Sequence, residues 1–290
     1  MSSQDKAMSL FPPPLPLDEE YSISSEESTS LKRVIGIQDD NELKQHLLSV
    51  QAEAYAVYPY PCIRLFDFAR FKITKHFAYE SVIKLGKERK NAIFLDLPCC
   101  DYWTVGHKLF RTTPETFPVP FLQGDIFDPN FLQPGVPALD TSSQPIDSPP
   151  SLTDSDLTSL TPLQHHVSVI YASSFFHLFG EDEQFKLAHL FASLLSPLPG
   201  SIIFGSHNGA SDTEGDKPGS IRLTTRGKTI FAHSPSSWKE LWTGKNGPFS
   251  PEQVSVQVEV KKVERKDTAR VFNLEQPYIS YRHIWSVTRR

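Results

Sequence analysis

The chain has 290 residues and a formal net charge of −5, and 39% of its residues are hydrophobic. This length and hydrophobic content suffice for a folded core in one large domain or two small ones. The charge balance is acidic, and no stripe of lysine and arginine interleaves with aromatic residues. Both features argue against nucleic acid and against an anionic membrane surface as partners.

The three cysteines, Cys62, Cys99 and Cys100, include an adjacent pair but no Cys-x-x-Cys motif. This pattern argues against a disulfide framework and against a zinc site, and it fits a reducing compartment. No segment approaches the about 18 consecutive apolar residues of a spanning helix, and no basic region followed by a hydrophobic one opens the chain. We therefore expect a cytoplasmic protein without a bound metal.

Residues 1–32 are expected to form a disordered tail, because serine, proline and acidic residues dominate and no apolar periodicity is present. Helices are expected over residues 33–90. The first begins near Asp39, where Asp39 or Asp40 can cap it, and carries Leu43, Leu47 and Val50 at helical spacing. A second helix, near residues 79–90, leads into the first strand.

Residues 91–101 (Asn-Ala-Ile-Phe-Leu-Asp-Leu-Pro-Cys-Cys-Asp) are the stretch around which the fold is predicted to form. An apolar run of strand length ends on Asp96 and passes into a turn of small residues. The first strand of an open α/β sheet meets its ligand in this way. A buried strand that ends on an acid also occurs in α/β proteins without a ligand, so both interpretations stay open.

The remaining pattern predicts a mixed sheet in one domain over residues 33–290. Residues 91–206 form its core, with strands near 121–127, 167–174 and 201–206 and a mobile surface insertion at 130–162. Residues 207–290 form a loop and an antiparallel strand pair, because apolar and polar residues alternate over 254–260 and 279–287. The predicted fold class is α/β, with a mostly parallel sheet closed by an antiparallel hairpin.

Several separated blocks of sequence together indicate a family. In chain order they are residues 62–64, 73–76, 94–100, 106–110, 124–128, 173–179 and 285–289. With these blocks the chain resembles fungal class I S-adenosylmethionine-dependent methyltransferase-like proteins of the type that tailors secondary metabolites. The resemblance runs from about Tyr60 to the C-terminus and implies a Rossmann-like fold.

The chain departs from that family after the first strand. There the family has a glycine before the cysteine pair, then a further glycine, a helix and a second strand that ends on an acid. Here Pro98 replaces the first glycine, and only five residues separate Cys100 from Gly106. A helix and a strand with their turns need about 30 residues, so the glycine-rich turn and second strand are missing. The loss of a pair of charge-assisted hydrogen bonds would weaken cofactor binding by about two to four decades.

The resemblance implies S-adenosyl-L-methionine as the cofactor and a small-molecule methyl acceptor. The residues that it places at the cofactor are Asp96 and Cys99 at the turn, Asp125 and Ile126 at the adenine, and Ala172 and Ser173 at the methyl-donor end. Asp125 is alternatively an acid that closes a turn. His177 is a candidate catalytic base, or a structural histidine between Phe176 and Leu178, which is the commoner role for a lone histidine in an apolar run.

Two functions follow from the sequence. The first is transfer of the sulfonium methyl group to an oxygen or another nucleophile of a small metabolite. The second is a catalytically inactive remnant of the methyltransferase fold, acting as a scaffold or a ligand-binding module. The interval 98–105 distinguishes the two functions. An interval that is truly shortened fits the inactive remnant, and an interval shortened by a missing exon fits the enzyme. The acceptor and the oligomeric state have no signal in the sequence.

Overall fold

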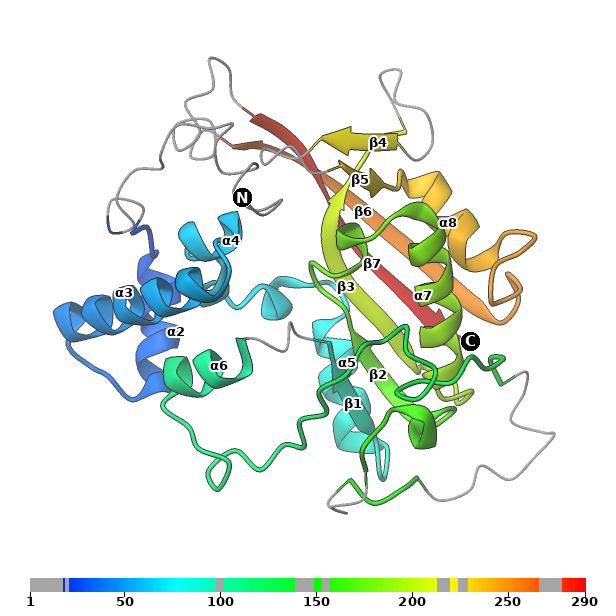
Figure 1. Cartoon of the computed structure of the whole chain (residues 1–290), viewed down its shortest axis with the longest axis horizontal. Helices are drawn as coiled ribbons and strands as arrows, with labels where there is room; N and C mark the ends of the chain where they lie inside the picture. Colours follow the sequence, from blue (N-terminus) through cyan, green and yellow to red (C-terminus); the bar gives the residue numbers. More distant parts are fainter. Residues whose placement is uncertain are drawn as a thin grey trace.

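A computed structural model describes residues 18, 21–97, 102–138, 149–152, 157–212, 220–223, 229–265 and 278–290. Its main feature is a five-stranded sheet with the strand order β1-β2-β3-β7-β6 (Figure 1). The strands are β1 (Ile93–Asp96), β2 (Val167–Tyr171), β3 (Ile202–Gly209), β6 (Val254–Arg265) and β7 (Tyr278–Arg289). The first three run parallel, and β7 is antiparallel to both β3 and β6. The predicted α/β sheet with its closing antiparallel pair is confirmed.

Helices cover both faces of the sheet. The helices α7 (Glu181–Leu194) and α8 (Pro235–Thr243) pack with inward residues of the strands, among them Trp285, in the main core. The opposite face is covered by α5 (Tyr79–Glu88), whose Val82 packs with Val169 and Phe204. The central strands β2 and β3 thus bury side chains on both faces, as a central parallel strand does.

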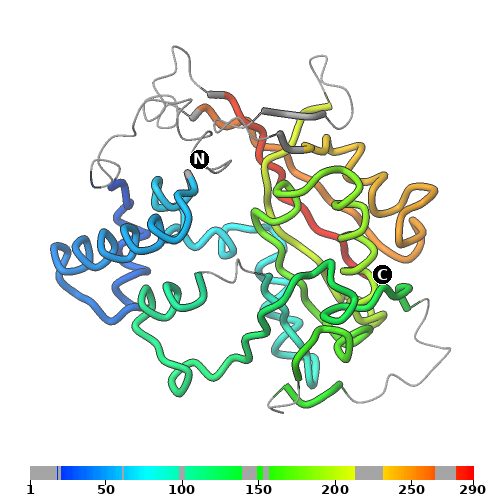
Figure 2. Tube along the Cα trace, viewed as in Figure 1, coloured from blue at the N-terminus to red at the C-terminus, as the bar shows by residue number. Residues whose placement is uncertain are grey.

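A separate group of helices lies beside the sheet, at the left in Figures 1 and 2. It consists of α2 (Ser25–Ile35), α3 (Asp40–Val57), α4 (Pro61–Arg64) and α6 (Trp103–Phe110). We call these four helices the helical unit. Their buried residues form a cluster of their own, and among the described residues this cluster contains none from the five-stranded sheet. Although α6 follows β1 in sequence, its Val105 and Leu109 pack into the helical unit.

The predicted disordered tail is wrong at its C-terminal end, where α2 begins at Ser25. The side chain of Ser24 accepts a hydrogen bond from the amide of Glu27 (3.2 Å), and the Glu27 carboxylate accepts one from the amide of Ser24 (3.0 Å). The serine- and acid-rich composition that suggested disorder is here a capping box. Residues 1–17 lie outside the described part. Of the two aspartates predicted as caps of α3, Asp39 provides the cap.

The strand predicted over residues 121–127 is also wrong. This segment forms no strand pairing and ends in a turn, which the Asp125 carboxylate closes by accepting a hydrogen bond from the amide of Phe127 (2.9 Å). Gly124 and Asp125 favour turns, while Leu122 and Ile126 still pack against the main core. The apolar side chains of this extended segment follow the sequence pattern of a strand, which is why the sequence predicted one here. In the described part of the chain β1 therefore pairs with β2 alone and is an edge strand.

The insertion at 130–162 was predicted to be mobile, but its two ends are anchored. Leu132 and Leu160 are buried in the main core, and the amide of Leu160 donates to the carbonyl of Phe131 (2.8 Å). Residues 139–148 and 153–156 lie outside the described part.

The segment between β3 and β6 contains more structure than the predicted loop. A hairpin of β4 (Ser220–Leu223) and β5 (Thr229–Ala232) precedes α8. The sequence Ser234-Pro235 resembles a turn, but it begins α8 with a serine cap and a proline in the first turn. No helix in the described ranges combines the length and the apolar character needed to cross a membrane.

Candidate functional site

The carboxyl ends of the parallel strands bring three of the predicted site residues together. Asp96 ends β1 and is the register partner of Tyr171, which ends β2. Ala172 and Ser173 follow directly. Ligands of open α/β sheets bind at this edge, so Asp96, Ala172 and Ser173 lie where the sequence predicted a site. Cys99 lies outside the described residues.

The Asp96 carboxyl group has an unusual environment. Its side chain is open to solvent, yet the surrounding protein desolvates the carboxylate and raises the pKa of Asp96 to about 6. A hydrogen bond from the Leu97 backbone partly opposes this rise. Asp96 therefore gains or loses its charge near neutral pH, which an ordinary surface aspartate does not do.

The turn after β2 is held by β3. The hydroxyl of Ser173 contacts the carbonyl oxygen (3.3 Å) and the hydroxyl (3.1 Å) of Ser206, and the amide of Ser174 donates to the same carbonyl (2.6 Å). Ser174 has a φ of 55°, a left-handed conformation that costs a non-glycine residue about 1 to 3 kcal/mol. A Cβ added at Gly205 would lie 2.3 Å from the carbonyl oxygen of Ala172, so only glycine lets the two segments approach this closely.

Charged groups of β7 and of the segment after α4 interact near Tyr171. Arg282 of β7 interacts electrostatically with Tyr171 and with Lys72. Desolvation lowers the pKa of Lys72, and its ion pair with Asp67 (2.7 Å) opposes that change. Desolvation raises the pKa of Tyr171, and the Asp96 charge adds to this rise. Arg282 therefore acts on the charges of both Tyr171 and Lys72, and Asp96 acts on Tyr171 from the end of β1.

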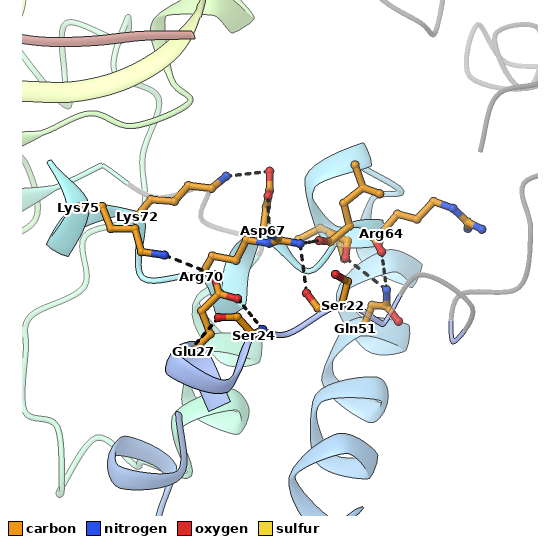
Figure 3. Close-up of polar contacts among 11 residues, drawn as sticks. Ser22, Ser24, Glu27, Gln51, Arg64, Asp67, Arg70, Lys72 and Lys75 are labelled. Carbon is orange, nitrogen blue, oxygen red and sulfur yellow. Dashed lines mark hydrogen bonds and ion pairs between the residues drawn. The ribbon is translucent and has the colours of Figure 1, made fainter. Parts of the chain in front are cut away.

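A polar network fixes the segment that carries Lys72 (Figure 3). Figure 3 shows Asp67 between Arg70 and Lys72, while Lys75 pairs with Glu27 of α2 (3.5 Å). Arg70 also donates to the carbonyl of Ser22 (3.2 Å). These contacts join the start of the helical unit to the loop that leads toward the sheet.

His177 lies in a short 3-10 helix, η6 (Phe176–Leu178), and belongs to a group of four histidines. The ring centroids of His177 and His207 are 6.5 Å apart, and those of His207 and His283 are 5.7 Å apart. The buried His207 accepts a hydrogen bond from the indole of Trp285 (2.9 Å). Burial, and then the charges of His283, His177 and His233, hold the pKa of His207 well below its usual value.

The sequence did not indicate this histidine group, because its members are spread over 106 residues and come from η6, β3, β7 and the loop before α8. Two members of the group lie on the same face of the sheet, because His207 and His283 are register partners on β3 and β7. Desolvation lowers the pKa of His233 to about 4. Within the described ranges no three His, Cys, Asp or Glu side chains are placed to hold a metal ion.

The Asp125 turn lies beside the loop that follows β2, although the strand expected there is absent. Phe127 packs edge-to-face on Phe179, with ring centroids 5.3 Å apart. Ile126 is buried in the main core, and the exposed Asp125 has one carboxylate oxygen engaged in its own turn. The turn-closing interpretation of Asp125 therefore describes this structure.

Comparison with known proteins identifies the family. Residues 17–69 match the family described as meroterpenoid methyltransferase N-terminal domain, and this range contains α2, α3 and α4. The Asnovolin E/Chermesin D methyltransferase nvfJ of Aspergillus novofumigatus is 31% identical over 205 residues, which are 69% of this chain and 69% of that protein. The chain belongs to this fungal methyltransferase family.

Other members of the methyltransferase family agree. The O-methyltransferase phiE of Fungal sp. (strain ATCC 74256) is 32% identical over 67% of this chain, but the match spans only 62% of phiE. Methyltransferase adrK of Penicillium roqueforti is 28% identical over 68% of each chain. The family resemblance stated from the sequence blocks is thus confirmed.

One solved structure overlaps most of the chain. The Burkholderia thailandensis 1,6-didemethyltoxoflavin-N1-methyltransferase, bound to 1,6-didemethyltoxoflavin and S-adenosylhomocysteine, covers 87% of this chain and 91% of its own, with 12% identity and a TM-score of 0.37. A TM-score this low adds nothing to the assignment, which rests on the fungal relatives.

Proposed function

We propose that the chain is an S-adenosylmethionine-dependent methyltransferase that transfers a methyl group to an oxygen or another nucleophile of a small secondary metabolite in the cytoplasm. The observation that carries this proposal is the convergence of Asp96, Ala172 and Ser173 at the carboxyl edge of β1 and β2. Relatives named as methyltransferases support it. They give no support to the alternative of an inactive remnant.

The residues at this edge fit the proposed cofactor in part. Ala172 and Ser173 would border the methyl-donor end, Asp96 would contact polar groups of the cofactor, and Cys99 belongs to the same proposal by resemblance. Asp125 has a second carboxylate oxygen for the exocyclic amine of adenine, with Ile126 beside it. When bound, S-adenosylmethionine supplies an electrophilic methyl group on a sulfonium centre.

The protein's own contribution is alignment, because an in-line displacement is accelerated mainly by holding the two reacting atoms in register. The rigid turn at Ser173 and Ser174 suits this task. A base is needed only for a weakly nucleophilic acceptor. We keep His177 as the candidate for that role, since it follows Ser173 by four residues and lies in the half-buried η6.

The test is a calorimetric titration of S-adenosylhomocysteine and S-adenosylmethionine into the 290-residue chain. We expect binding that is weaker than micromolar because Pro98 replaces the family's glycine, and we expect Asp125→Ala to weaken it by about tenfold or more. Asp128→Ala is the matched control, because Asp128 closes a neighbouring turn by accepting from the amide of Asn130 (2.9 Å).

The absence of heat up to millimolar ligand, from a protein that unfolds cooperatively, would overturn the proposed function. Equal weakening by Asp125→Ala and Asp128→Ala would overturn only the place of Asp125 at the adenine, because it would show that Asp125 acts through the fold of its loop alone.

A further inference from the structure

His76 is the buried contact between the segment leaving the helical unit and the centre of the sheet. It follows η3 (Lys72–Lys75) directly and is 7% exposed. Its Nε2 lies 3.1 Å from the carbonyl oxygen of Gly205 and 3.2 Å from that of Trp285. Its Nδ1 accepts a hydrogen bond from the amide of Ala78 (3.0 Å).

These partners determine the protonation of the ring. Carbonyl oxygens only accept, so Nε2 must carry the hydrogen, and a backbone amide only donates, so Nδ1 must present its lone pair. His76 is therefore a neutral Nε2–H tautomer with both nitrogens in use. Desolvation lowers the pKa of His76, which keeps this form dominant even though the two carbonyls and the charge of Glu259 favour protonation.

The ring also packs firmly in the layer between α5 and the sheet. Phe204 lies edge-on to it with ring centroids 5.0 Å apart, and Phe77 lies at 4.5 Å. Three hydrogen bonds and two aromatic neighbours fix the position of the His76 ring more narrowly than packing alone would fix an apolar side chain of similar size.

The two carbonyls that His76 holds lead directly to the proposed site. Gly205 and Trp285 are register partners across β3 and β7. The residue after Gly205 is Ser206, whose carbonyl oxygen accepts from the hydroxyl of Ser173 and the amide of Ser174. Gly205 itself lies against Ala172 without room for a Cβ. The contacts from His76 to the turn after β2 are thus continuous.

We propose that His76 is a positioning residue, which holds β3 in register with the turn at residues 172–174 and so couples the helical unit to the methyl-donor end of the site. This inference rests on the proposed function only where it identifies that end of the site as the methyl-donor end. The mechanical coupling itself concerns only atoms of this chain.

The first measurement compares ligand affinity in two buried variants. His76→Leu removes all three hydrogen bonds, and Val82→Ala is the control, because Val82 is buried in the same layer without a polar side chain. At a temperature where every variant is fully folded, we expect His76→Leu to raise the Kd for S-adenosylhomocysteine by about tenfold. Val82→Ala should leave it within about twofold.

A conservative variant separates positioning from packing. The amide of His76→Gln offers a donor and an acceptor, so it should restore the Kd to within about threefold of the parent value. An unchanged Kd in His76→Leu, or equal losses in His76→Leu and Val82→Ala, would overturn the proposal.

A second readout needs no ligand, so it separates failure of this inference from failure of the proposed function. Hydrogen exchange of the Ser174 amide reports its bond to Ser206. We expect His76→Leu to accelerate that exchange by about tenfold. In Val82→Ala the exchange rate of the Ser174 amide should be unchanged relative to the exchange rates of the β2 amides. If the parent chain binds no S-adenosylhomocysteine, exchange alone decides, and unchanged protection of Ser174 in His76→Leu overturns the coupling.

Discussion

Gly205 is the residue at which β3 comes closest to the turn of the proposed site. An added Cβ would meet the carbonyl oxygen of Ala172 at 2.3 Å, and the three nearest atoms are all backbone atoms of Ala172 and Ser173, so no side-chain movement relieves the clash. We expect Gly205→Ala to lower the free energy of unfolding by about 3 kcal/mol or more. The matched control is Gly86→Ala on the exposed side of α5, where no atom lies within 4 Å of the added Cβ.

The control should change stability in the opposite direction. In a helix interior alanine is favoured over glycine by about 0.5 to 1 kcal/mol, so Gly86→Ala should stabilise the fold. Urea unfolding of both variants checks the pair. Equal effects at the two positions would show that the close approach at Ala172 is not a constraint.

The buried histidines predict a loss of stability on acidification. The pKa of His233 is lowered from 6.5 to about 4, and those of His207 and His76 are also lowered. Below about pH 6.5 the unfolded chain therefore binds protons that the folded chain does not, and stability falls. His233 alone accounts for about 3 kcal/mol between pH 6.5 and pH 4. Asp96 has a raised pKa and acts in the opposite direction, but solvent screening keeps its share small.

The measurement is the free energy of unfolding between pH 8 and pH 4. His233→Gln should flatten its pH dependence, because Gln keeps a polar side chain and cannot titrate. His189→Gln, in α7 and outside the histidine group, is the control for the replacement of a histidine by Gln. The same slope in parent and His233→Gln would contradict the prediction.

At the scale of elements, α2 is the sharpest difference between sequence and structure, and its cap can be tested. Ser24→Ala removes the side chain that accepts from the amide of Glu27, and we expect a loss of about 1 kcal/mol in the free energy of unfolding. Ser25→Ala, one residue into the helix, should stay within about 0.5 kcal/mol. Denaturant unfolding of the two variants decides. No difference between them would mean that the capping box contributes nothing.

Several elements were predictable because local and tertiary preferences agree. Asp39 before an amphipathic run predicts α3, and strict alternation predicts β6 and β7. The strand prediction for residues 121–127 was wrong, because a strand needs a neighbouring strand to pair with. Whether such a neighbour is available depends on the arrangement of the whole sheet and not on the local sequence. The helix α8 was hidden, because Ser-Pro-Ser-Ser is equally typical of a turn and of a capped helix start.

The site was predictable to the same extent. Asp96, Ala172 and Ser173 follow buried strands, and parallel strands end at one edge, so their meeting required only the topology. His76 and His207 could not be found in this way, since their partners lie about 80 to 200 residues away on strands whose register the sequence does not state.

At the scale of the molecule, the helical unit and the sheet have separate cores. We therefore expect a cavity in one core to loosen that part first. Leu47 of α3 and Leu187 of α7 are both fully buried, and either change to alanine should cost about 3 kcal/mol. Hydrogen exchange should show that Leu47→Ala accelerates α3 much more than β2, with the reverse ranking for Leu187→Ala. Equal acceleration of α3 and β2 in both variants would show one cooperative unit.

The position of β1 explains how a sheet can exist with so short an interval after Cys100. In the described chain β1 pairs with β2 alone, it has four residues, and its Phe94 is 47% exposed. A deletion at the margin of a sheet removes the pairing of one strand, whereas a deletion in its middle leaves two strands without partners. At this margin an inserted helix and strand of about 30 residues would add a strand beside β1. The registers that join β1, β2, β3, β7 and β6 would stay as they are.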